Sequence, residues 1–125
     1  MRWRLTVRSG PKVKKQSFPQ LGEALDALEK RARELAGAVP DRGFDAKIRR
    51  FEPVELVSAR LELAGPERFV PSVRAGVDVR GDGSVEAYRG RVRREVVQPR
   101  QGESVYGALR RSLEEEVGSS QSTLT

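Results

Sequence analysis

Three arginines alternate with other residues late in the chain, at Arg89, Arg91 and Arg93. Residues two apart in a β-strand point to the same face and lie about 6.5–7 Å apart. An arginine ladder of this kind would therefore track the phosphates of an extended nucleic-acid strand, which bind cationic side chains through charge. The alternative interpretation is a solvated, charged face that keeps the sheet from aggregating.

The ladder lies in the second strand of a predicted β-hairpin. Its turn spans residues 80–84 and contains Asp82-Gly83, a pair of residues typical of tight turns. Alternation before the turn predicts an inward face of Val73, Ala75, Val77 and Val79. After the turn we expect one strand to run to Val97. Its apolar residues change phase, because Val85 and Ala87 have one parity while Tyr88, Val92 and Val96 have the other. Either a bulge lies near Ala87-Tyr88 or Val85 is exposed. If the set with Tyr88 faces the core, the three arginines point outward.

A second basic cluster lies at the N-terminus, where residues 1–20 contain no acid. Trp3, Leu5 and Val7 alternate with basic residues, which predicts a half-buried strand. Ser9-Gly10-Pro11 favours a turn into a short strand over 12–17, anchored by Val13. We expect the basic side of this hairpin to join the ladder on one sheet face. The candidate nucleic-acid-binding residues are Arg2, Arg4, Arg8, Lys12, Lys14, Arg89, Arg91 and Arg93.

Two amphipathic helices are predicted to cover the opposite face of the sheet. The first begins at Ser17, in position to cap it, and ends near Gly37, with the apolar stripe Phe18, Leu21, Leu25, Leu28, Ala32 and Leu35. The second is capped by Ser104 and runs to Val117. Residues 118–125 are polar, and we expect a flexible C-terminal tail there.

A further strand is predicted over 51–64, so the order is strand, strand, helix, strand, strand, strand, helix. Single apolar faces on the helices and alternating strands favour an α+β fold. We expect a two-layer sandwich, with a mainly antiparallel sheet and two helices packed on one face. Residues 1–117 should form a single domain.

The amino-acid composition excludes several kinds of metal site and catalytic site. The chain has 125 residues with no histidine and no cysteine, so the commonest zinc ligands and histidine-based catalysis are excluded. We predict no catalytic residue, no metal site and no cofactor, and therefore a protein that is not an enzyme. No apolar run is long enough to cross a membrane, and we expect a cytoplasmic location. A net charge of +6 favours an anionic partner.

These features favour a non-enzymatic domain that binds nucleic acid through an arginine-rich open sheet face, with RNA slightly ahead of DNA. The alternative is a protein–protein interaction or assembly component, including a homo-oligomer, with no nucleic-acid role. Salt separates the two hypotheses, because binding to phosphates weakens as salt rises whereas an apolar interface persists.

Parts of the predicted order resemble known families. The helix–strand–strand–strand–helix portion is similar to double-stranded-RNA-binding domains. The strand–helix–strand–strand–strand–helix portion resembles ribosome-hibernation factors, with a closing helix that opens Ser104-Val105-Tyr106-Gly107-Ala108-Leu109. The pattern of Trp3, Phe18, Leu21 and Ala24 is similar to the arm domains of phage-type integrases. Each resemblance covers only part of the chain, so no family is assigned, and a shared fold does not give a function.

Overall fold

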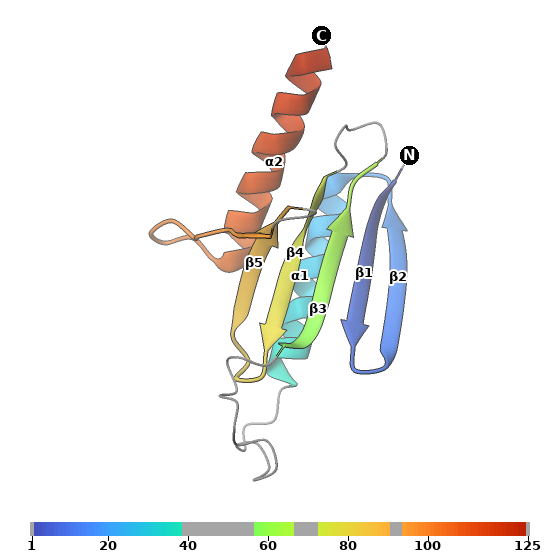
Figure 1. Cartoon of the computed structure of the whole chain (residues 1–125), viewed down its shortest axis with the longest axis vertical. Coiled ribbons are helices and arrows are strands. Elements are labelled where there is room, and N and C mark those ends of the chain that lie inside the picture. Colours follow the sequence, from blue (N-terminus) through green and yellow to red (C-terminus); the bar gives the residue numbers. More distant parts are fainter. Residues whose placement is uncertain (1, 39–56, 67–72, 91–93, 125) are drawn as a thin grey trace.

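The computed structural model describes residues 2–38, 57–66, 73–90 and 94–124, with side chains of the last segment described to Gly118. It shows one sheet with the strand order β2-β1-β3-β4-β5-β6 and two helices (Figure 1). The strands are β1 (Trp3–Ser9), β2 (Lys12–Phe18), β3 (Val57–Ala64), β4 (Arg74–Arg80), β5 (Val85–Arg89) and β6 (Glu95–Val96). The helices are α1 (Leu21–Gly37) and α2 (Val105–Leu124).

All neighbouring strands among the described residues pair antiparallel. The chain leaves the edge strand β2, passes through α1 and returns as β3 on the far side of β1. In Figure 1, α1 accordingly lies behind the sheet, and α2 lies beside β5 and extends beyond the ends of the strands. The predicted α+β sandwich is confirmed.

Both helices bury their apolar residues against the same face of the sheet. Helix α1 contributes Ala24, Leu25, Leu28 and Ala32, and α2 contributes Ala108, Leu109 and Leu113. From the sheet, the core contains alternate residues such as Leu5, Leu61, Leu63, Val77 and Val79. Because side chains alternate along a strand, the residues between these positions lie on the opposite face, which we call the open face.

The first helix begins later than the sequence predicted. Ser17 pairs with Arg4 in the sheet, and Phe18 pairs with Trp3, so both residues belong to β2. Helix α1 starts only at Leu21, with no side-chain cap at Gln20. The prediction that Ser17 caps α1 is wrong, because the strand pairing extends through Phe18 and carries the chain past the expected helix start.

Helix α2 is capped as predicted, because Ser104 Oγ accepts a hydrogen bond of 3.0 Å from the Gly107 amide. Its backbone remains helical to Leu124, past the expected end of the domain at Val117. No proline interrupts the sequence in this stretch. The flexibility expected for residues 118–125 stays a prediction.

A bidentate ion pair braces the start of α2. Arg111 donates to both carboxylate oxygens of Glu103 at 3.0 Å, and the Arg100 amide donates to the same carboxylate at 2.9 Å. These hydrogen bonds favour the charged form, first that from Arg111 and then that from Arg100. They lower the pKa of Glu103 from 4.5 to about 2.

This pKa shift predicts an acid-dependent contribution to stability. A lowered folded-state pKa stabilises the protein above the unfolded value of 4.5, and the effect is lost as the pH falls towards about 2. We expect Glu103→Gln to have a lower melting temperature than the wild type near neutral pH. This difference in melting temperature should close as the pH falls from 4.5 towards about 2. Thermal unfolding monitored by circular dichroism checks this. A gap that stays constant with pH would show that the carboxylate charge contributes nothing.

The segment that was expected to form one long strand is a turn with two strands. Strand β5 ends at Arg89, and Gly90 follows with a φ of 112°, a conformation that favours glycine. The chain then pairs back on itself, with Tyr88 opposite Val96 and Arg89 opposite Glu95. The prediction of a continuous strand to Val97 is wrong, because Gly90 lets the backbone reverse. Residues 91–93 lie outside the described residues.

Candidate nucleic-acid interface

The open face is rich in arginine, and the register shows which charged residues share it. Arg4 and Arg8 of β1 lie opposite Ala64 and Arg60 of β3, away from the core residues Leu5 and Val7. Extending this alternation through the paired strands places basic and acidic side chains on the open face. They are Arg4, Arg8, Lys15, Arg60, Glu62, Arg74, Asp78, Arg80 and Glu86, with Arg94 just before β6.

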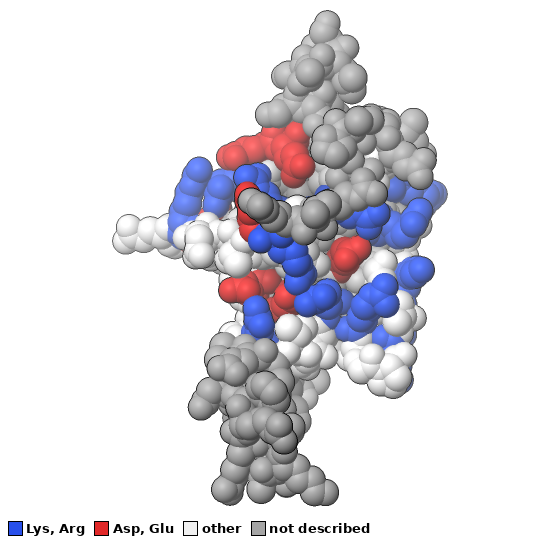
Figure 2. All heavy atoms as spheres, viewed as in Figure 1, with Lys and Arg blue, Asp and Glu red and all other residues white. Residues whose placement is uncertain are grey.

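The side of the open face formed by β1 and β2 carries positive charge that no described acid pairs with. Arg4, Arg8 and Lys15 are exposed, and within the described part of the chain no ion pair involves them. Figure 2 views this face and shows basic side chains over β1 and β2, with acidic side chains lying nearer the middle of the sheet. Arg2, just before β1, is exposed as well. We call Arg4, Arg8 and Lys15 the basic edge.

Two of the predicted binding residues in β2 lie on the other face. Lys14 pairs with Val7 and Lys12 with Ser9, so both lysines share the side of the sheet that the helices cover. They are exposed because they lie on the edge strand. Val13, the expected apolar anchor, lies on the open face with 46% of its surface exposed. The placement predicted for Lys12 and Lys14 is therefore wrong, because pairing with β1 sets the opposite parity.

The arginine ladder is also misplaced in part. Ala87, in the core, has the same parity as Arg89, and Arg89 accordingly reaches Ser112 of α2 at 3.4 Å. It also lies 3.5 Å from Glu95. The outward placement predicted for Arg89 is wrong, because the inward residues of β5 are Val85 and Ala87. Arg91 and Arg93 lie outside the described residues, and a role for them stays a prediction.

The acids of the open face lie on β3, β4 and β5, and each is held by arginine. Glu62 accepts from Arg74 at 3.1 Å, and Glu86 accepts from Arg80 at 2.7 Å. Asp78, whose side chain is only 7% exposed, accepts from Arg60 at 2.9 Å. It also lies 3.4 Å from Arg94. Positive charge in the middle of the sheet is thus partly compensated, whereas the basic edge has no ion pair within the described segments.

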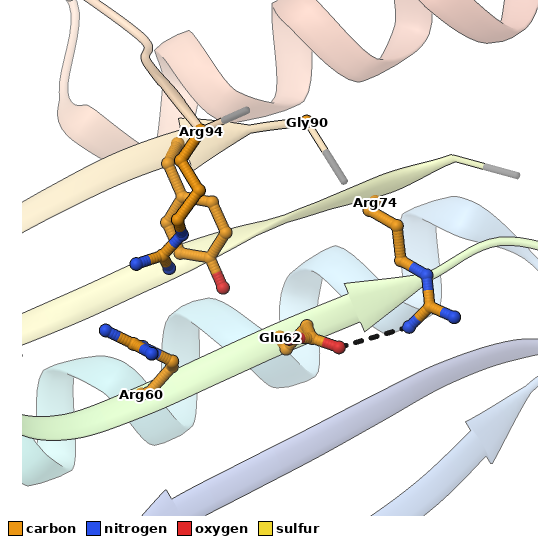
Figure 3. Close-up of a pocket in the computed structure, with 6 residues that line it drawn as sticks. Arg60, Glu62, Arg74, Gly90 and Arg94 are labelled. Atoms are coloured by element: carbon orange, nitrogen blue, oxygen red, sulfur yellow. Dashed lines mark hydrogen bonds and ion pairs between the residues drawn. The ribbon is translucent and has the colours of Figure 1, made fainter. Parts of the chain in front are cut away.

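Three of these arginines, Arg60, Arg74 and Arg94, surround a hollow of about 250 Å³ in the open face (Figure 3). Arg60 and Glu62 project into it from β3, and Arg94 and Arg74 approach from the neighbouring segments. We call it the tyrosine hollow, and its lining residues are Arg60, Glu62, Arg74, Tyr88, Gly90 and Arg94. Sequence reasoning did not single out Arg60, Arg74 or Arg94, which come from three separate segments of the chain.

Tyr88 was predicted to face the core, but it lies on the open face. It pairs with Gly76, which lies between the inward residues Ala75 and Val77. The Arg94 guanidinium lies 3.6 Å from the centre of its ring, a cation–π contact. Burial is the main cause that raises the pKa of Tyr88, and Arg94 opposes it. With Gly76 beneath the ring and Arg94 above it, the tyrosine offers no free surface for stacking a base.

A second hollow of about 380 Å³ lies beside the first and shares Arg60 with it. Its lining residues are Arg8, Gly10, Val57, Ser58, Ala59 and Arg60. Arg8 and Arg60 are direct cross-strand neighbours, and like charges in such positions repel. An anion bound between them would relieve this repulsion. Because Arg8 belongs to the basic edge and Arg60 lines both hollows, the second hollow connects the basic edge to the tyrosine hollow.

Other kinds of site find no support in the described segments. Residues 2–38, 57–66, 73–90 and 94–124 contain no group of acids that could hold a metal ion. No helix in these ranges is long and apolar enough to span a membrane. Comparisons with protein-family models, with curated proteins and with solved structures find no match to this chain.

Proposed function

We propose that this chain is a nucleic-acid-binding domain whose open sheet face contacts the sugar–phosphate backbone. The observation that carries the proposal is the basic edge, where exposed Arg4, Arg8 and Lys15 lie on one face with no ion pair among the described residues. Cations placed in this way release counterions when they meet phosphates, which is the main source of sequence-independent affinity.

Contact through the backbone, without base stacking, fits the aromatic content of the open face. Sheet surfaces that read single-stranded RNA stack bases on exposed aromatic side chains. Here the aromatic residue of the paired strands on this face is Tyr88, which is 5% exposed and covered by Arg94. We therefore expect weak sequence preference. The proposal keeps the expectation of a non-enzymatic, cytoplasmic domain, with RNA slightly ahead of DNA.

The second candidate function is assembly with another protein or another copy of the chain. Strand β2 pairs on one side only and is exposed along most of its length, which is the usual template for strand addition. However, Lys12, Lys14 and Lys15 occupy it, and lysines on an edge strand oppose such pairing. The edge therefore supports assembly less than the basic edge supports binding to an anion.

Two double variants on the same strand pair test the proposal. Arg8→Gln with Lys15→Gln removes two charges from the open face, and Lys12→Gln with Lys14→Gln removes two from the other face. We expect the first pair to weaken single-stranded RNA binding roughly tenfold to a hundredfold. It should also reduce the slope of log affinity against log salt by about 1.4. The second pair should change the affinity by no more than about threefold, through long-range charge alone.

Fluorescence anisotropy with single-stranded RNA, duplex RNA and duplex DNA, at about 50 and about 200 mM salt, measures these effects. Equal losses in the two double variants would show that charge matters but the open face does not. Absence of binding to all three ligands at the lower salt, by a folded wild type, would remove the proposed function. Self-association that survives both salt concentrations would then favour assembly.

A further inference from the structure

Two residues that line the tyrosine hollow each carry a buried hydrogen-bond donor for which the described residues supply no acceptor. The hydroxyl of Tyr88 and the Nε–H of Arg74 are both buried, and neither makes a hydrogen bond of acceptable geometry with a described residue, because the nearby Arg94 guanidinium lies over the face of the Tyr88 ring. Buried polar groups in folded proteins are nearly always hydrogen-bonded, so each exception requires an explanation. Two such donors lining the same hollow indicate a ligand that supplies acceptors.

The surrounding arginines have further donors with no acceptor among the described residues. Each guanidinium carries five N–H groups, whereas Arg60 uses its Nε towards Asp78 and Arg74 uses one Nη towards Glu62. The acids that contact these arginines, Glu62 and Asp78, carry less charge than the three guanidinium groups together. The hollow therefore has an excess of positive charge and of donors, which fits an oxyanion.

We infer that the tyrosine hollow binds the terminal phosphate of a nucleic-acid strand. A phosphate monoester has three free oxygens, a charge of about −1.5 to −2 at neutral pH, and one ester link. A terminal phosphate can thus enter a hollow end-on. The nucleic-acid chain continues on both sides of an internal phosphate, so an internal phosphate must lie along the surface. The volume of about 250 Å³ is below the roughly 300–1,000 Å³ of sites that enclose a whole small molecule, which suits one group.

The rest of the strand would have a path away from this end. Arg60 lines both hollows, and Arg8 of the second hollow belongs to the basic edge. A strand held by its terminal phosphate could therefore continue over Arg60 and Arg8 onto β1 and β2. The inference rests on the proposed function and adds to it a preference for phosphorylated ends.

The test compares one oligonucleotide in three forms: with a 5′-phosphate, with a 3′-phosphate, and with hydroxyl groups at both ends. We expect one of the phosphorylated forms to bind the wild type at least about tenfold tighter than the hydroxyl form, as hydrogen bonds to a charged group imply. Tyr88→Phe keeps the ring for Arg94 but removes the hydroxyl, and should reduce this preference about tenfold.

Two further variants make the comparison specific. Tyr106→Phe makes the same chemical change on α2, where the ring contacts Arg33, and should leave the preference unchanged. Arg74→Lys keeps the charge but removes the Nε–H, and should reduce the preference as Tyr88→Phe does. Tyr88→Phe is expected to melt no lower than the wild type, because its hydroxyl has no partner among the described residues.

Each outcome decides between the two proposals. Equal, salt-dependent affinity for all three forms would overturn the terminal-phosphate inference and leave backbone binding in place. A preference that Tyr88→Phe and Arg74→Lys both retain would place the terminal phosphate elsewhere and also overturn it. Binding of none of the three forms would overturn both proposals.

Discussion

Replacement of Gly76 by alanine is expected to destabilise the domain by about 3 kcal/mol, the upper end of the usual cost of overpacking. A Cβ atom at this position would collide with the carbonyl oxygen of Leu61 and lie 2.7 Å from the Tyr88 hydroxyl. The backbone oxygen cannot move without separating β3 from β4. We therefore expect the melting temperature to fall by roughly 10 °C.

Gly22→Ala is the matched control for this change. Gly22 lies in α1, where the added Cβ would meet only the end of the Arg110 side chain, at 3.9 Å. Alanine is a better helix former than glycine, so this variant should be unchanged or up to about 1 kcal/mol more stable. Chemical denaturation measures the free energy of unfolding of both variants. If Gly76→Ala were as stable as the wild type, the close contact between Tyr88 and β4 would be contradicted.

Replacement of Asp78 by asparagine is expected to lower stability while strengthening nucleic-acid binding. The buried carboxylate contacts Arg60 at 2.9 Å and Arg94 at 3.4 Å, and asparagine keeps its shape without its charge. Hydrogen bonds to charged groups contribute about 1.5–3 kcal/mol. Because both arginines are about 40% exposed, solvent screens this contribution, and we expect a loss of about 1–2 kcal/mol.

The gain in binding follows from the open face becoming one charge more positive. Glu62→Gln is the control for stability, because both side chains of the Glu62–Arg74 pair are partly exposed, at 41% and 36%, so solvent screening should keep its contribution below about 1 kcal/mol. Urea denaturation and RNA anisotropy on the same samples check both effects. Weaker binding by a folded Asp78→Asn protein would contradict the proposed role of the open face.

Local pattern was enough to predict most of the elements. Alternating apolar residues in Trp3–Ser9 and Arg74–Arg80 correspond to buried positions in β1 and β4, and the apolar stripe of α1 faces the sheet. The layout follows because single-faced helices must cover an alternating sheet. The structure has six strands instead of the five expected because β6 pairs antiparallel with β5 where one continuous strand was predicted.

The side on which each charged residue lies was harder to predict. In β5, Tyr88 shares its parity with Val92 and Val96, which favoured it for the core, yet cross-strand pairing with Gly76 places it on the open face. A glycine opposite a tyrosine was the available signal, because a ring can fill the space that a missing side chain leaves. The tyrosine hollow depends on the register between segments, which a single sequence does not specify.

The most direct test of the open face is the change in backbone amide NMR shifts when a single-stranded RNA oligonucleotide is added at low salt. We predict that the amides of Arg4, Arg8 and Lys15 show the largest shift changes and that Arg60 is also affected. These changes should become smaller as salt is added. Lys12 and Lys14, on the other side of the same edge strand, should shift less. Shifts confined to α1 and α2 would contradict binding through the open face.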